Sequence, residues 1–430
     1  MSKGSQVAAP IRLAECIDAY LFKLGSSGRP SRKALAKLVE VAWLASLKTE
    51  EGRPTVCNLA YIDPHNPDPN PPPLIRLPRW SYYAINDPVP LTVGNLAKLA
   101  PALNPYTANI AFFDLPARGL FISGFTDQQT LFRQGFEFEE DGGWARPGLF
   151  QLDILGIGSL AAYDSDKLIA SVRHETLVTN TADVFSSGLI AEKLRAILGY
   201  PIVDEGLSFD TAMRCLCRIL IRMRRFRHGG ALLFDNPPAK SRLRLKHSVK
   251  YTKLRAAIAL YFEAQAAYLD VPFDNDEEPI DVQYDNLLEQ TIALENIEDA
   301  RVAMLGAVGL IASLSRIDGL VLLGNQFELN GFGGEIIAKN DPPVVVISRT
   351  SQVPKASAKS VSISDFGTRH RSMFRYCWAS PNCVGIVVSQ DGDVRVITRD
   401  ADRIVLWENV RVDRSKPVAR VHRRPKRVGP

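Results

Sequence analysis

Apolar residues in the first half of the chain form short runs that are separated by glycine, proline and aspartate. Two segments with helical spacing come first, at 10–25 and 31–47, and the second carries Leu35 and Leu38 on one stripe. Several strands close together with few helices predict an α+β module for residues 1–204. Its strands are predicted at 55–62, 109–113, 120–125, 149–155, 160–163 and 168–172.

A proline-rich stretch interrupts this module at 63–73. Because proline has no amide hydrogen, the stretch can hold little regular hydrogen bonding, and an exposed insertion is the simpler interpretation. A lid or a partner-binding segment is the alternative. His65 and His174 stand alone, with no nucleophile or metal-ligand spacing beside them, so neither predicts catalysis.

A domain boundary is predicted at 204–206, ahead of a helix at 211–227. The spacing of arginines along this helix predicts a basic face turned to solvent, with phosphate contact as the alternative. The arginines on that face are Arg214, Arg218, Arg222 and Arg225.

Beyond the boundary, strands and helices alternate. A glycine-led apolar run at 228–234 predicts a buried strand. Two helical segments follow at 251–269 and 284–315, and the second is long enough to break near 295–296. The order predicts a mixed sheet with helices on both faces, so the fold class is α/β. The remaining predicted elements are a hairpin at 318–329 and strands at 344–347, 384–388, 394–398 and 404–407.

Three short pieces of this second half carry candidate chemistry. Asp318-Gly319-Leu320 opens the hairpin with an acid at its mouth. Gly367-Thr368-Arg369-His370-Arg371 is predicted to begin a helix. Val387-Val388-Ser389-Gln390 ends a buried strand and would bring a hydroxyl to a sheet edge.

The helix start at 367–371 has an unusual charge. Free N–H groups make a helix N-terminus positive, and acidic residues are normally favoured there. Arg369 and Arg371 go against this preference, which indicates a ligand rather than helix stability. Guanidinium groups and free N–H groups would act on the same phosphate oxygens.

The ordered trio resembles the diadenylate cyclase family, whose DisA-N-type domain joins two ATP molecules into cyclic di-AMP. That family has an Asp-Gly-Ala strand, a Gly-Thr-Arg-His-Arg helix start and a strand that ends in Ser-Glu. The helix start is complete here, whereas Leu320 replaces the alanine and Gln390 replaces the glutamate. The run Gly230-Ala231-Leu232 is similar to the strand that begins the same domain.

The resemblance implies roles for particular residues. Asp318, Arg369, His370 and Arg371 are expected to be catalytic, and Asp318 is also expected to hold Mg²⁺ or Mn²⁺. The family's reaction needs two protomers whose sites face each other, so a homodimer or higher oligomer is expected. The expected ATP contacts come from Gly319, Leu320, Gly334, Gly367, Thr368, Ser389 and Gln390, although glycines near 334 equally fit a tight connection.

The two departures from the family pattern leave other interpretations open. Leu320 is bulkier than alanine and would crowd a nucleotide, and Gln390 lacks the charge of glutamate. A nucleotide-binding sensor that has lost turnover is therefore the second interpretation. A nucleic-acid-binding protein is the third. Its affinity would fall steeply with salt, whereas turnover of ATP would depend on a divalent metal.

The first module, residues 1–204, is similar to sensor-like domains that precede some diadenylate cyclase domains. The likeness rests on the turn Glu50-Glu51-Gly52-Arg53-Pro54 and on the strand pair around Gly156-Ile157-Gly158. It implies a small-molecule ligand for this module and places a cyclase domain at 205–412.

Charge changes the picture only at the C-terminal end. The chain carries +5 overall, but residues 411–430 hold eight Lys and Arg against one acid, so the rest is close to neutral. Residues 413–430 are therefore expected to form a disordered basic tail. Non-specific contact with nucleic acid is the alternative.

The remaining composition predicts a cytoplasmic protein. No apolar run approaches the roughly 20 residues that a membrane helix needs, and the first residues lack an apolar signal segment. The six cysteines show neither a disulfide nor a zinc spacing, so we expect reduced, mostly buried thiols.

Overall fold

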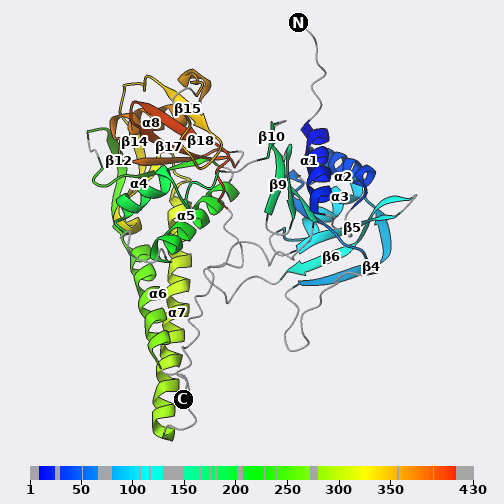
Figure 1. Cartoon of the computed structure of the whole chain (residues 1–430), viewed down its shortest axis with the longest axis horizontal. Helices are drawn as coiled ribbons and strands as arrows, with labels where there is room; N and C mark the ends of the chain where they lie inside the picture. Colours follow the sequence, from blue (N-terminus) through cyan, green and yellow to red (C-terminus); the bar gives the residue numbers. More distant parts are fainter. Residues whose placement is uncertain are drawn as a thin grey trace. The chain divides into compact units, whose positions relative to one another are not determined.

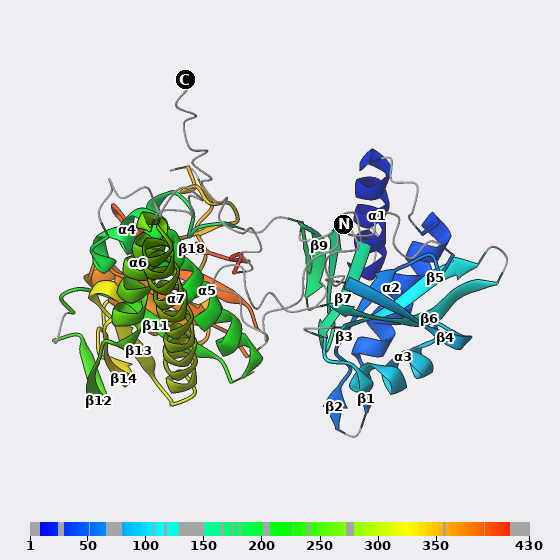
Figure 2. The same cartoon turned by 90° about the horizontal axis from the view of Figure 1, so that it is seen from below.

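The structure is a computed structural model, and its contacts divide the chain into two units, one within residues 1–179 and one at 180–414 (Figures 1 and 2). It describes residues 9–412 except for 25–29, 51, 66–79, 106–107, 116–117, 129–149, 165–166, 174–175, 180–181, 201–206, 227, 239–240, 272–278, 356–357 and 391.

The first unit is an eight-stranded sheet with helices α1 (Ala9–Leu24) and α2 (Arg32–Ser46) packed on one face. Alternate residues of the strands, such as Leu59, Phe112 and Leu152, point to these helices and form the core. The sheet order is β10-β9-β8-β7-β3-β5-β6-β4. The bounds are β3 (Cys57–Tyr61), β4 (Trp80–Pro90), β5 (Ala108–Leu115), β6 (Gly119–Gln128), β7 (Phe150–Gly156), β8 (Ser159–Asp164), β9 (Lys167–Arg173) and β10 (Thr176–Val178).

The two predicted helices and the six predicted strands of this unit are present. The sequence analysis missed α3 (Val93–Leu99) and β4, which contains Asn86-Asp87-Pro88 and therefore reads as a turn. The turn after α2 is a short ladder of β1 (Thr49–Glu50) and β2 (Arg53–Pro54). Most of the proline-rich stretch, and His174, lie outside the described residues.

The second unit is a mixed eight-stranded sheet in the order β12-β14-β13-β11-β16-β17-β18-β15. The pairs β11–β13 and β15–β18 are parallel and the others antiparallel. The bounds are β11 (Gly230–Phe234), β12 (Leu243–Tyr251), β13 (Leu320–Leu323), β14 (Leu329–Ile336), β15 (Val345–Ser348), β16 (Val384–Val388), β17 (Val394–Asp400) and β18 (Arg403–Trp407).

Helices cover both faces of this sheet, which confirms the predicted α/β class. Helix α8 (Thr368–Ala379) packs Met373, Phe374 and Cys377 on one face. Helix α5 (Leu207–Arg225) and the end of α7 (Ile280–Leu314) lie on the other, where Gly230 leaves room for Met223 and Ser315. None of the helices in the described part of the chain has the length and apolarity needed to cross a membrane.

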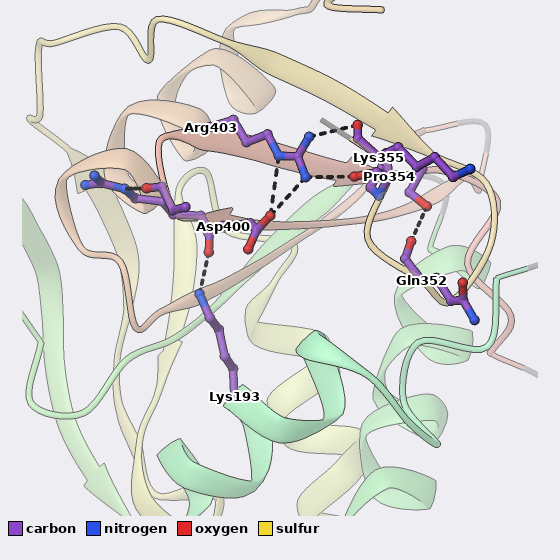
Figure 3. A network of polar contacts seen from close by, with 9 residues as sticks. Lys193, Gln352, Pro354, Lys355, Asp400 and Arg403 are labelled. Atoms are coloured by element: carbon purple, nitrogen blue, oxygen red, sulfur yellow. Dashed lines mark hydrogen bonds and ion pairs between the residues drawn. The ribbon is translucent and has the colours of Figure 1, made fainter. Parts of the chain in front are cut away.

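Helix α4 (Leu189–Leu198) belongs to the second unit. The second unit therefore begins earlier in the chain than the boundary predicted at 204–206. Those three residues lie outside the described part of the chain. The amino group of Lys193 donates to the carbonyls of Pro381 and Arg399 at 2.6 Å. Figure 3 shows one of these bonds at the labelled Lys193. Burial lowers the pKa of this amino group. Beside it, Arg403 binds Asp400 and the carbonyls of Pro354 and Lys355, which closes the same end of the sheet.

The arginines of α5 correct one prediction. They do not form a solvated face: Arg214 is buried and pairs with Asp210, and Arg222 lies against α7 at Gly309. Arg218 and Arg225 are half-buried. Helix α7 crosses the side of α5 that the sequence pattern assigned to water, and the long arginine stems pack against it.

A second correction concerns α7, which is one continuous helix instead of two segments that break near residue 295. Residues 281–305 contain neither glycine nor proline. Ala293, Ile297 and Ala300 are buried along one side of the helix. Helix α6 (Lys253–Asp270) runs beside it, and Figure 1 shows the pair projecting away from the sheet. All six cysteines are free thiols, and burial raises the pKa of Cys57 to about 12.

The position of α4 generates a stability prediction. A fragment of residues 180–414 should fold cooperatively, whereas one of residues 205–414 should lose stability on the order of 5 kcal/mol or fail to stay folded, because it lacks the five buried side chains of α4. Urea unfolding followed by circular dichroism compares the two. Equal midpoints would contradict the assignment of α4.

Candidate functional site

Helix α8 begins with an N-terminus that no side chain caps. Gly367 is the N-cap residue and has no side chain to accept a hydrogen bond, and the first turn contains no acid. The backbone carbonyl of Gly367 accepts from the N–H groups of His370 and Arg371 at 3.1 Å. The N–H groups of Thr368 and Arg369 are left to an outside acceptor. Thr368 is exposed. The helix start therefore offers donors to an anion.

The side chain of Arg369 reaches the start of the central strand β11. Gly229, with a φ of +69°, lies just before that strand, and a Cβ there would stand 2.8 Å from Nη1 of Arg369. The same point lies 3.4 Å from the backbone nitrogen of Gln390. The missing side chain at Gly229 thus leaves room for the guanidinium. The helix start at 367–371 therefore lies close to the strand end at 387–390.

The register of the sheet brings the third piece to the same end. Gly230 pairs with Val388, so β16 delivers Ser389 and Gln390 to the start of β11. Leu232 pairs in parallel with Val321, so β13 also starts there, with Asp318 just before it. Only β11 separates β13 from β16, which puts their ends roughly 10 Å apart.

Asp318 is exposed at this end of the sheet. No described residue donates to its carboxylate, while its backbone carbonyl lies 3.5 Å from the Lys246 amino group on β12. Gly319 has a φ of +120°, and a Cβ there would lie 2.5 Å from the backbone of Gly333. Only glycine fits this close approach, which holds the Asp318 backbone against β14.

The bulk of Leu320 is accommodated within the fold. Its side chain is 3% exposed and belongs to the core beneath α8. Gly334, its partner in the register, leaves the room: a Cβ at that position would lie 2.8 Å from Cδ1 of Leu320. The leucine therefore occupies the core instead of the exposed end of the sheet.

His370 is buried and faces Arg395 of β17, whose Nη1 lies 3.3 Å from Nε2 of the ring. An arginine can only donate, so Nε2 accepts and the proton of the neutral ring is on Nδ1. Burial, followed by the charges of Arg395 and Arg369, lowers the pKa of His370 to about 4. Arg395 also pairs with Glu408 at 3.6 Å. His370 therefore positions a neighbouring cation, and only Nδ1 remains as a donor to a ligand.

Ser389 closes the turn between β16 and β17. Its hydroxyl oxygen accepts from the N–H of Asp393 at 3.0 Å, and its own N–H donates to the Asp393 carbonyl at 2.9 Å. The hydroxyl hydrogen is still available to a ligand. Gln390 is exposed in the same turn.

The arginines of the site differ from others in the same unit. Arg375, one turn further along α8, pairs with Asp341, and Arg403 pairs with Asp400 at 3.1 Å. Within the described ranges, the guanidinium groups of Arg369 and Arg371 have no such acid, and both are half-buried. Two unpaired guanidinium groups beside free N–H groups form an anion-binding arrangement.

The sequence analysis missed Gly229, Lys246 and Arg395, which reach the site through sheet register and not through a motif. In the described part of the chain no three His, Cys, Asp or Glu side chains gather as a metal site. Asp318 alone still suits Mg²⁺ or Mn²⁺, because such ions often take one or two carboxylates, water and substrate phosphate oxygens.

Comparison with known families matches residues 26–127, which span α2 to β6, to a family described as "Probable sensor domain DACNV". This supports the expected sensor-like module at the N-terminal end. No diadenylate cyclase domain family is detected in the chain. No characterised protein and no solved structure matches it.

The packing of Leu320 predicts that Leu320→Ala lowers the free energy of unfolding by about 3 kcal/mol, because a cavity opens in the core beneath α8. Urea unfolding measures this. The volume-conserving change Leu320→Met is the control and should cost less than about 1.5 kcal/mol. An unchanged midpoint for the alanine variant would show that the side chain is not packed as described.

The low pKa of His370 predicts a loss of stability in acid. The unfolded ring binds a proton below about pH 6.5 and the folded ring only near pH 4, so stability falls as the pH drops through this window. Between pH 7 and 4.5 the parent should lose about 2.5 kcal/mol more than His370→Gln. Urea unfolding at both pH values tests it, and parallel losses in the two proteins would refute it.

Proposed function

We propose that the second unit is a nucleotidyltransferase of the diadenylate cyclase type, which joins two ATP molecules into cyclic di-AMP, and that the first unit is its sensor. The observation that carries the proposal is the arrangement at one end of the sheet: an uncapped helix N-terminus, with two arginines and a carboxylate that have no ion-pair partner among the described residues. The chain resembles that family at the same residues.

The reaction forms a bond between a ribose 3′-oxygen and an α-phosphorus, and the bond from that phosphorus to the pyrophosphate oxygen breaks. It happens twice, and each time a hydroxyl proton is lost and pyrophosphate leaves. Positioning and neutralisation of phosphate charge supply most of the catalysis in such transfers. Arg369, Arg371 and the free N–H groups of α8 suit the phosphate charge, and Asp318 suits the hydroxyl proton.

A divalent cation, when bound, would neutralise phosphate charge and orient the pyrophosphate. Asp318 is the residue that would hold it, together with phosphate oxygens. His370 keeps Arg395 in place, and the Ser389 hydroxyl can donate to a phosphate or ribose oxygen. Lys246 is a further cation at the same end of the sheet.

One site holds one ATP in this scheme, so two protomers must face each other before the second bond forms. The first unit, which contains the stretch matched to a sensor family, would control that meeting by binding a small molecule. Regulation would then act on assembly.

A second candidate is a nucleotide sensor of the same fold without turnover. It is favoured by Gln390, which lacks the charge of the family's glutamate, and by the finding that no three His, Cys, Asp or Glu side chains gather as a metal site among the described residues. Both candidates use the same phosphate contacts. Product formation separates them.

We predict that the purified chain, given ATP with Mn²⁺ or Mg²⁺, produces cyclic di-AMP, and that Asp318→Asn and Arg371→Gln each lower the rate by at least about 100-fold. Chromatography with mass detection measures the product. Asp318→Asn removes the base and metal ligand, whereas Arg371→Gln removes one phosphate contact.

Matched controls come from the same unit. Arg375→Gln changes an arginine one turn along α8 that already has an acidic partner, and Asp402→Asn changes an exposed acid in the turn at the opposite end of β17. Both should retain rates within about twofold. Bound ATP without any product would favour the inactive sensor, and no ATP binding at all would exclude both candidates.

A further inference from the structure

The hairpin of α6 and α7 is more apolar than two helices can bury. Along one side of α7, Ala293, Ile297, Ala300 and Met304 are buried. The other side carries large apolar residues that remain exposed, and a helix that is apolar all round is normally enclosed by other elements. These exposed residues are Val282, Tyr284, Leu287, Leu288, Ile292, Leu294, Val302 and Leu310.

Several of the exposed residues follow a regular stripe. Tyr284, Leu287, Leu288 and Leu294 recur at spacings of three, four and seven residues, which places them on one broad face of the helix. Their exposed fractions are 68%, 55%, 59% and 48%. This is the pattern of a helix that packs against another helix.

Helix α6 carries exposed apolar residues of its own. Leu269 is 72% exposed and Leu260 is 38% exposed, but they stand nine residues apart and therefore lie on opposite sides of that helix. The two helices also leave a hollow of about 400 Å³ between them, lined in part by Ala267, Ile292 and Asn296. The two helices are therefore not fully packed against each other.

Charge limits how a partner can lie on this surface. Residues 256–300 contain twelve Asp and Glu and no Lys or Arg. Basic residues stand only where the hairpin leaves the sheet: Lys253, Arg255 and Arg301. Two such hairpins side by side in the same direction would repel, whereas opposite directions bring each acidic end to a basic end.

We propose that the exposed stripe of α7 packs against the same stripe of a second copy of this chain, with the two helices running antiparallel. A helix of this length spans about 50 Å, enough for a contact of the standard size of roughly 1,600 Å². This contact is separate from the meeting of sites that the proposed reaction requires and does not depend on it.

The chain's own basic C-terminal segment is the competing occupant. Residues 411–430 match the acidic hairpin in charge, but their apolar content is four valines and one alanine, interrupted by prolines. Such a segment cannot cover a stripe of leucines along α7. A second hairpin supplies an equal stripe and its own basic end.

Sedimentation of the full chain over a range of concentrations tests the proposal. The parent should dimerise, and Leu294→Glu should weaken the dimer at least 100-fold, because the two-fold contact would bury two added charges. Asn296→Glu adds the same charge on an exposed position of the same helix, beside the hollow, and should leave the dimer within about threefold. Circular dichroism verifies that both variants are folded.

A monomeric parent, or equal weakening by both variants, would overturn the proposal. Loss of the dimer when the chain is ended at Val412 would assign the surface to the basic segment instead. The relative direction of the two α7 helices is tested by oxidising a mixture of the Tyr284→Cys and Val302→Cys proteins with glutathione disulfide. An antiparallel contact gives a disulfide between the two different variants, whereas a parallel contact gives a disulfide between two copies of Tyr284→Cys.

Discussion

The second unit depends on two adjacent glycines at the start of its central strand. Gly230 faces α5 and the end of α7, and a Cβ there would stand 2.9 Å from Met223 and 3.0 Å from Ser315. Gly229 faces the other way, toward Arg369 of α8. Both helical layers can close on one point of the sheet because neither glycine has a side chain. The ends of β13 and β16 meet at that same point, so the site results from how the sheet packs.

The sequence predicted the elements whose pattern is purely local. Buried strands such as β11, β13 and β16 are unbroken apolar runs, and α8 begins after a glycine as expected. Strand β12 was missed because it is an exposed edge of mixed polarity, and α5 was misread because its arginines pack against a helix from elsewhere in the chain. Asp318, Arg369 and Arg371 could be found from motifs. Gly229, Lys246 and Arg395 could not, because only the register brings them in.

Charge pairing sorts the arginines of this unit into two kinds. Several hold the fold together through acids or carbonyls, as Arg403 and Arg375 do. Arg395 is shared between Glu408 and the neutral ring of His370. A protonated His370 would add a third cation beside Arg395 and Arg369, and the low pKa of the ring avoids that repulsion. The positive charge of the candidate site therefore comes from its arginines and not from His370.

Helix α7 links the site to the projecting hairpin. It is continuous over Ile280–Leu314, its last turn is closed by Ser315, and Asp318 follows directly before β13. A long helix transmits rotation and displacement with little bending, whereas the glycine at 319 fixes the Asp318 backbone against β14. Association through the hairpin would thus act on the one element that leads straight to the candidate catalytic acid. Under the two proposals, the contact at the hairpin and the facing of the sites would use separate surfaces, and α7 is the element that runs from one to the other within each protomer.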